Sequence, residues 1–168
     1  MLLDLINPRK LRRALVYILL AGLVFIAQDL LVSRITILGV KAMIVPALVA
    51  AVGLYEGASW GGFLGLGAGW CMDLGYTEHT VLFLILFTVL GFGAGVLGKY
   101  FMQKGLLPFL TLFAVCMIII TAFQALPFLI AGNAVWPVLR TALIQIAWSL
   151  PWAVPVYYPC RAIAAKEL

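Results

Sequence analysis

Apolar residues fill six runs of this chain, and short polar breaks separate the runs. An apolar stretch of about 20 residues is typical of a helix that crosses a bilayer, because a helix satisfies its own backbone hydrogen bonds. Charged residues make up 10% of the 168 residues, against about 25% in a soluble domain. The sequence predicts one domain, residues 1–168, an all-α integral membrane protein with six transmembrane helices at residues 14–32, 42–55, 60–74, 81–100, 106–131 and 134–160.

Basic residues gather at the polar breaks on one side of these predicted helices. Short cytoplasmic loops carry an excess of Lys and Arg, so the bias predicts orientation. With the N-terminus inside, two bases face outward, Arg34 and Lys41. Eight face the cytoplasm: Arg9, Lys10, Arg12, Arg13, Lys99, Lys104, Arg161 and Lys166. We expect both termini inside (N-in, C-in) and the loop with Glu78 and His79 outside, and the few bases do not indicate nucleic-acid binding.

Two of the predicted helices have unusual features. The run at residues 42–55, with Pro46 near its start, is too short to cross a core of about 30 Å. We expect it to borrow residues 37–40 or to leave the membrane locally thin. The last run holds Pro151, Pro155 and Pro159, which we expect to bend its cytoplasmic half.

Glycines recur every four residues in the segment GASWGGFLGLGAGWCMD, at Gly57, Gly61, Gly65 and Gly69, and Asp73 follows at the same spacing. Positions four apart lie on one face of a helix, so the run predicts a groove without side chains. In a membrane, small residues let two helix backbones approach closely. We expect the other helices to pack against this one. The face has two possible occupants, the predicted fourth helix with its own pair, Gly91 and Gly95, or a transmembrane helix of another protein.

Three charged residues fall within or beside the apolar runs, toward the predicted outer side: Asp29, Asp73 and Arg140. An intramembrane charge is costly and is a functional-site hypothesis by default. The three can be a structural pairing or a site for a ligand or partner. We expect at least one carboxylate to pair with Arg140, with Asp73 preferred because the glycine spacing directs it inward. Glu56, at a helix junction, is expected to be solvated on the cytoplasmic side.

The sequence offers little for catalysis. It contains no Ser/His/Asp or Cys/His set and no His-rich metal spacing, and its one histidine is His79. The glycine run lacks the strand, loop and Lys of a phosphate-binding motif. A site built from Asp29, Asp73 and His79 is conceivable, but we expect a protein that is not an enzyme, with no catalytic, metal-binding or cofactor-binding residues and no cofactor.

The order of these elements resembles the MreD family of rod shape-determining membrane proteins. The resemblance covers nearly the whole chain. It rests on the helix ending AQDLL, the stretch ITILGVKAMIVP, the run YEGASWGGFLGLGAGWCMDLGY, the helix closing LGFGAGVLGKY, and SLPWAVPVYYPCRAI. The family pattern has a proline at the start of its second helix and then GxxxGxxxD. Many members carry Pro-Asp at the start of the second helix, whereas Pro46 is followed by Ala47 in this chain.

The resemblance implies a non-enzymatic scaffold of the cell-elongation machinery in the bacterial plasma membrane. Its expected partners are an MreC-like single-span protein and, through it, the peptidoglycan polymerase RodA, a class B penicillin-binding protein and the actin-like MreB. The expected contacts are helix to helix, with the glycine faces as docking surfaces.

The same helix pattern is similar to the substrate-binding S components of energy-coupling-factor vitamin transporters, whose six-helix bundle the MreD family is thought to share. This is the alternative function. S components typically show an AxxxA face on their first helix, and Ala14, Ala21 and Ala27 do not make that spacing. Their outer loops would also be expected to be richer in polar and aromatic groups.

Overall fold

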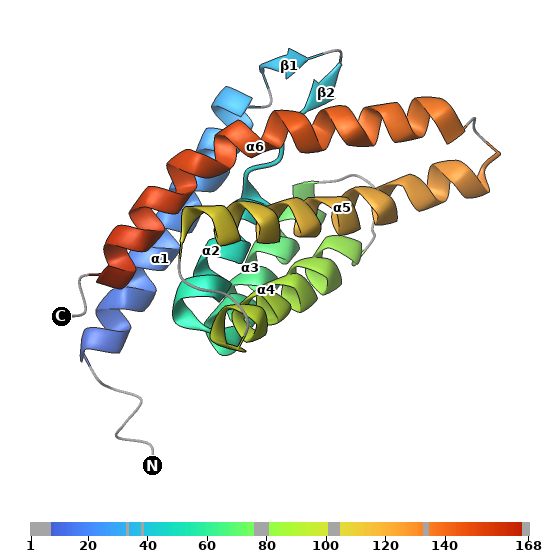
Figure 1. Ribbon diagram of the computed structural model, residues 1–168. Coiled ribbons are helices and arrows are strands. Elements are labelled where there is room, and N and C mark those ends of the chain that lie inside the picture. The colour runs from blue at the N-terminus through green and yellow to red at the C-terminus, as the bar shows by residue number, and fades with distance from the viewer. Residues whose placement is uncertain are drawn as a thin grey trace.

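The computed structural model describes residues 8–32, 34–37, 39–75, 81–100, 105–132 and 135–165. This part of the chain is helical apart from one small hairpin and the connections (Figure 1). The elements are α1 Pro8–Ala27, η2 Gln28–Val32, β1 Thr36–Ile37, β2 Val40–Lys41, α2 Val45–Glu56, α3 Ala58–Gly75, α4 Leu82–Tyr100, α5 Leu106–Ile130 and α6 Val135–Ala165. The expected all-α class is therefore confirmed. The loop that holds Glu78 and His79 lies outside the described residues.

Three of these helices are long and apolar enough to cross a membrane, by length and composition: Arg12–Leu30, Leu82–Tyr100 and Leu106–Ile130. Many large apolar side chains on the outside of the bundle are exposed, among them Leu19 on α1, Phe63 on α3 and Ile85 on α4. A surface of this kind suits hydrocarbon and not water.

The segment before α2 differs from the prediction. Of the two alternatives, the extension of the helix into residues 37–40 is wrong. Thr36–Ile37 and Val40–Lys41 are short antiparallel strands in which Thr36 pairs with Lys41 and Ile37 with Val40, and Gly39 has a φ of 81°. At 12 residues, α2 is about 18 Å long, well short of a bilayer core. The residues at its start, 42–45, are buried, so α2 begins inside the protein, shortly after the hairpin.

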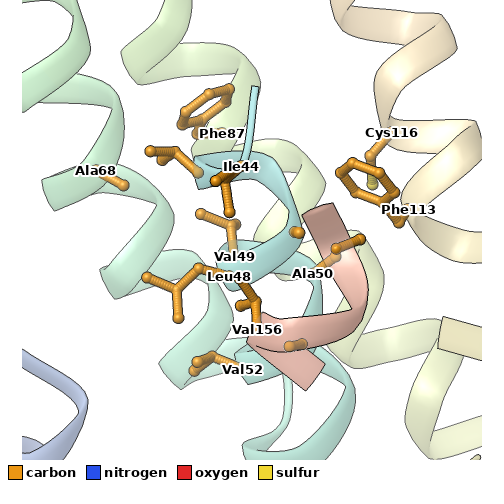
Figure 2. Close-up of a cluster of buried hydrophobic side chains, with 14 of the residues drawn as sticks. Ile44, Leu48, Val49, Ala50, Val52, Ala68, Phe87, Phe113, Cys116 and Val156 are labelled. Atoms are coloured by element: carbon orange, nitrogen blue, oxygen red, sulfur yellow. The ribbon is translucent and has the colours of Figure 1, made fainter. Parts of the chain in front are cut away.

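The short helix α2 is the centre of the bundle. Every residue from 42 to 54 is buried, and α2 contacts α1, α3, α4, α5 and α6. Its sequence, VPALVAAVGLYE, is apolar around its whole circumference, as a fully enclosed helix requires. Figure 2 shows side chains of α2, among them Leu48, Val49 and Val52, beside Ala68 of α3, Phe87 of α4, Phe113 of α5 and Val156 of α6.

The prediction that the glycine-rich third helix is the one the others pack against is therefore wrong. α3 contacts α2 and α4, but its opposite face is exposed at Trp60, Phe63, Leu66, Trp70 and Leu74. Four-residue spacing identifies one contact face on a helix, and it carries no information about the helix's other side. The central position goes instead to the helix without a polar or exposed face.

The last helix, α6, runs for 31 residues and remains continuous through its three prolines. Pro151 and Pro155 are exposed, whereas Ala153, Val156, Tyr157 and Cys160 face the core. Proline opens the hydrogen-bond ladder on its own face, so the helix bends around the core. Figure 1 shows this curvature, and it brings the end of α6 beside the start of α1.

Candidate functional site

The glycine face of α3 is filled by α4. A Cβ added at Gly61, Gly65 or Gly69 would come within 3.0 Å of the α4 backbone. The nearest α4 atoms are, in that order, Gly91 O, Phe87 O and Leu84 Cα. Seen from α4, a Cβ at Gly91 would meet the backbone of Gly61, and one at Gly95 would meet the backbone of Ala58. The two helices therefore touch backbone to backbone, and no third helix can enter between them.

Gly57 is a glycine for a different reason from the other three. It is the single residue between α2 and α3, with a φ of 96° and no atom within 4 Å of an added Cβ. Its N–H donates to Gly53 O at 2.9 Å, which ends α2. Positive φ is where glycine is favoured, so Gly57 is required for its conformation. Its backbone still lies against α4, because a Cβ added at Gly95 would come within 3.0 Å of Gly57 C.

Sequence reasoning missed Gly53, which takes the place expected for Gly57. It lies on α2, and a Cβ there would come within 3.0 Å of Gly91 O and of the Ala94 side chain. Three helices consequently meet at Gly53, Gly61 and Gly91. The signal was present, because Gly53 continues the four-residue spacing one step toward the N-terminus.

Asp73 caps the neighbouring helix. Its Oδ1 accepts a hydrogen bond from Phe83 N at 3.1 Å, and its Oδ2 accepts one from Leu84 N at 2.9 Å. These are N–H groups of the first turn of α4, which have no partner within the helix and lie at the positive end of its dipole. The carboxylate therefore stabilises the start of α4 from the end of α3.

The outer charged cluster is not assembled as predicted. Among the described residues no ion pair joins Arg140 to Asp73 or to Asp29. Asp29 and Arg140 are both exposed, on η2 and α6 respectively. The N–H groups of Phe83 and Leu84 already donate hydrogen bonds to the Asp73 carboxylate. The carboxylate therefore does not need a cation from another helix. His79 of the conceivable catalytic set lies outside the described residues.

Two polar side chains hold the N-terminus of α2. Gln28 is 9% exposed, and its Oε1 accepts hydrogen bonds from Ile44 N at 2.9 Å and Val45 N at 3.1 Å. Ser149 Oγ on α6 accepts from Met43 N at 3.0 Å and donates to Gln145 O at 2.7 Å. A buried helix start needs such partners, because water cannot reach its N–H groups. Sequence reasoning gave these residues no role, although a polar side chain in an apolar run was the available signal.

The other end of α2 carries a partly buried ion pair. Glu56 Oε2 lies 3.3 Å from Nη1 of Arg13, and Glu56 Oε1 accepts a hydrogen bond from Tyr17 Oη at 2.8 Å. The Arg13 and Glu56 side chains are 22% and 10% exposed, so the expected solvated junction is wrong. An acidic group at a helix C-terminus is unfavourable by itself, and the two partners from α1 offset that cost.

A cleft of about 640 Å³ lies between α5 and α6. It lies toward the N-terminal end of α2, because Gln124 Nε2 is 3.7 Å from Met43 Sδ, and Ser149, one turn after Gln145 on α6, accepts a hydrogen bond from Met43 N. Four lining side chains are polar but uncharged, and the rest are apolar. The lining comprises Thr121, Gln124, Ala125, Phe128, Pro137, Val138, Thr141, Ala142 and Gln145. Neutral amides and hydroxyls can form hydrogen bonds with an occupant, but they offer no general acid, base or nucleophile of unusual strength.

Within the described residues no group of three His, Cys, Asp or Glu side chains could hold a metal ion. The candidate features are thus a closed glycine interface, two polar clusters at the ends of α2, and one open neutral cleft. Comparison of the chain with protein-family models, with curated proteins and with solved structures finds no match.

Proposed function

We propose that this chain is a membrane scaffold of the MreD type, which acts without catalysis in the bacterial cell-elongation machinery. It binds an MreC-like single-span protein in the plasma membrane. Through that partner it associates with RodA, a class B penicillin-binding protein and MreB. All six helices lie within the bilayer, and both termini face the cytoplasm, as the distribution of Lys and Arg favours.

The observation that carries the proposal is the role of the GxxxGxxxD run. The resemblance to the MreD family rests in part on these residues, and each has a specific place in the fold. Gly61, Gly65 and Gly69 bring α3 against α4, and Asp73 then holds the first turn of α4. A spaced set of residues that builds one helix pair supports a resemblance better than apolar composition alone.

A second candidate function is that of a vitamin-binding S component. The α5–α6 cleft favours it, because about 640 Å³ lined by apolar residues and a few neutral polar groups lies within the range of small-molecule sites. The missing AxxxA face on the first helix weighs against it.

Affinity purification from the native membrane tests the proposal against this alternative. We expect the tagged chain to recover a single-span, coiled-coil protein and no ATPase, and its depletion to change cell shape. An untagged strain controls for non-specific recovery. Co-purification of a vitamin with an ATPase, or vitamin uptake that depends on this gene, would support the S component instead.

Orientation is tested separately with a cysteine placed at position 78 on a background in which Cys71, Cys116 and Cys160 are removed. The proposal expects a membrane-impermeant maleimide to label it from outside the cell. Labelling from the cytoplasmic side alone would overturn the orientation.

A further inference from the structure

The partner of the proposed scaffold needs a docking surface other than the glycine faces. Those faces are closed, since an added Cβ at Gly61, Gly65 or Gly69 already meets α4. The α5–α6 cleft is open, and Phe128 in its lining is 59% exposed. A binding site for a partner's transmembrane helix presupposes such a partner, so this inference rests on the proposed function.

The dimensions of the cleft suit a helix. Its lining runs from residue 121 to 128 on α5 and from 137 to 145 on α6. At about 1.5 Å per residue, this is roughly 10–12 Å, or two helical turns, on each wall. Small side chains stand on both walls, Ala125 on α5 and Ala142 on α6. Small residues at such positions let a neighbouring helix approach closely.

The polar groups of the cleft need hydrogen-bonding partners. Gln124 Nε2 has Met43 Sδ at 3.7 Å, a weak acceptor, and within the described residues the Gln145 amide has no hydrogen bond. The Thr121 and Thr141 hydroxyls donate to Met117 O and Pro137 O, both at 2.8 Å, which leaves their oxygens able to accept. In hydrocarbon, an amide without a partner is costly.

The chemistry of the lining limits the kinds of molecule that can occupy the cleft. An acyl chain has no donor or acceptor to offer Gln124 and Gln145. A charged group would find no counter-charge, because none of the nine lining residues is ionisable. A transmembrane helix with Ser, Thr, Asn or Gln at its contact face offers both apolar packing and neutral hydrogen bonds.

We propose that the α5–α6 cleft is the binding site for the partner's transmembrane helix, which places a neutral hydrogen-bonding side chain between Gln124 and Gln145. The glycine faces then hold the chain's own helices together, and the polar cleft holds the partner.

Photo-crosslinking tests this placement with two matched positions. The chain is co-expressed with the single-span protein of the same genome, with p-benzoylphenylalanine at Phe128 in the cleft or at Phe63 on the exposed face of α3. We expect the partner to be crosslinked from position 128 and not from position 63. Crosslinks from 63 but not 128, or from 128 to lipid, to a small molecule or to a second copy of this chain, would overturn the placement.

Substitutions inside the cleft give an independent readout. Ala142→Leu fills the cleft, and Ala147→Leu adds the same volume at an exposed position of α6. Gln145→Leu removes one hydrogen-bonding amide. We expect both cleft variants to remain folded and to recover about three- to thirtyfold less partner, while Ala147→Leu recovers the wild-type amount.

The outcomes separate this inference from the function beneath it. If Gln145→Leu and Ala142→Leu recover as much partner as the wild-type chain, the cleft is not the binding site of the partner's helix. The scaffold proposal would then still stand. Failure of the wild-type chain to recover any single-span partner would overturn the proposed function and this inference together. If Ala142→Leu does not fold, Gln145→Leu and the crosslink from position 128 decide the matter.

Discussion

The α3–α4 pair and the α5–α6 pair use opposite means of packing. Between α3 and α4, glycines remove the side chains and the two backbones touch, from Gly61 against Gly91 to Gly69 against Leu84. Between α5 and α6, side chains line an open cleft that contains four neutral polar groups. The first arrangement fixes one separation between two helices. The second leaves space and hydrogen-bonding capacity for another molecule.

Residues that are unusual in an apolar helix have two different uses in these two regions. Glycines at regular spacing were candidate docking residues, yet they serve the fold. Polar side chains divide by position. Gln28, Ser149 and Glu56 are bonded at the two ends of α2, whereas Gln124 and Gln145 face the cleft. A polar residue is therefore a stronger indicator of an external site when the fold itself leaves it poorly satisfied.

The largest effect is expected at the centre of the α3–α4 interface. Gly65→Leu puts a side chain where a Cβ alone would come within 3.0 Å of Phe87 O, and a backbone atom cannot move aside easily. We expect a destabilisation on the order of 3 kcal/mol or more and a loss of monodisperse protein in detergent. Gly67→Leu is the control, because an added Cβ there meets nothing within 4 Å. Equal tolerance at both positions would show that the interface is not close-packed.

A smaller effect is expected at the C-terminal end of α2. Glu56→Gln removes the charge that faces Arg13 and weakens the acceptor for Tyr17 Oη. The pair is partly buried, so we expect a loss of about 2 kcal/mol, between the effects typical of an exposed and of a fully buried pair, seen as a lower unfolding temperature in detergent. Tyr17→Phe removes one hydrogen bond and should cost about 1 kcal/mol. Unchanged unfolding temperatures for both variants would mean that this contact does not anchor α1 to α2.

The cap of α4 should contribute less. Asp73→Asn keeps one acceptor oxygen but removes the charge near the helix N-terminus, where Phe83 N and Leu84 N both donate. We expect a cost of about 1–2 kcal/mol in the same thermal assay. Asp73→Glu tests the reach of the carboxylate separately. A result for Asp73→Asn as large as that for Gly65→Leu would indicate a role beyond capping.

The smallest effect is expected at Arg140, which is exposed and has no ion pair within the described residues. Arg140→Leu should change the unfolding temperature little, because surface substitutions of this kind are usually within about 0.5 kcal/mol. Destabilisation by this variant equal to that of Asp73→Asn would restore the predicted pairing of these two residues.

Helix positions were largely predictable, because apolar runs and polar breaks determine them directly. The run at residues 81–100 became Leu82–Tyr100, and the internal candidate for the glycine groove, with Gly91 and Gly95, was the helix that fills it. The end of α3 was also close to its prediction. Here local composition was sufficient.

Burial and polar partners were not predictable in the same way. An apolar residue faces lipid or protein with equal ease, so the sequence did not distinguish the enclosed α2 from the exposed face of α3. The Glu56–Arg13 pair spans 43 residues, and its formation depends on how α1 lies against α2. Asp73 was identified as important, but its partners are backbone N–H groups, which every residue type except proline carries.

If the glycine face holds the fold and the α5–α6 cleft holds the partner, substitutions in the two regions should affect different quantities. Both quantities come from one purification of each variant: the amount of folded chain, and the ratio of recovered partner to folded chain. We predict that Gly65→Leu lowers the amount of folded chain and leaves the ratio at the wild-type value, whereas Ala142→Leu does the reverse. Normal folding of Gly65→Leu with a reduced ratio would contradict this division, because the glycine face would then be the docking surface.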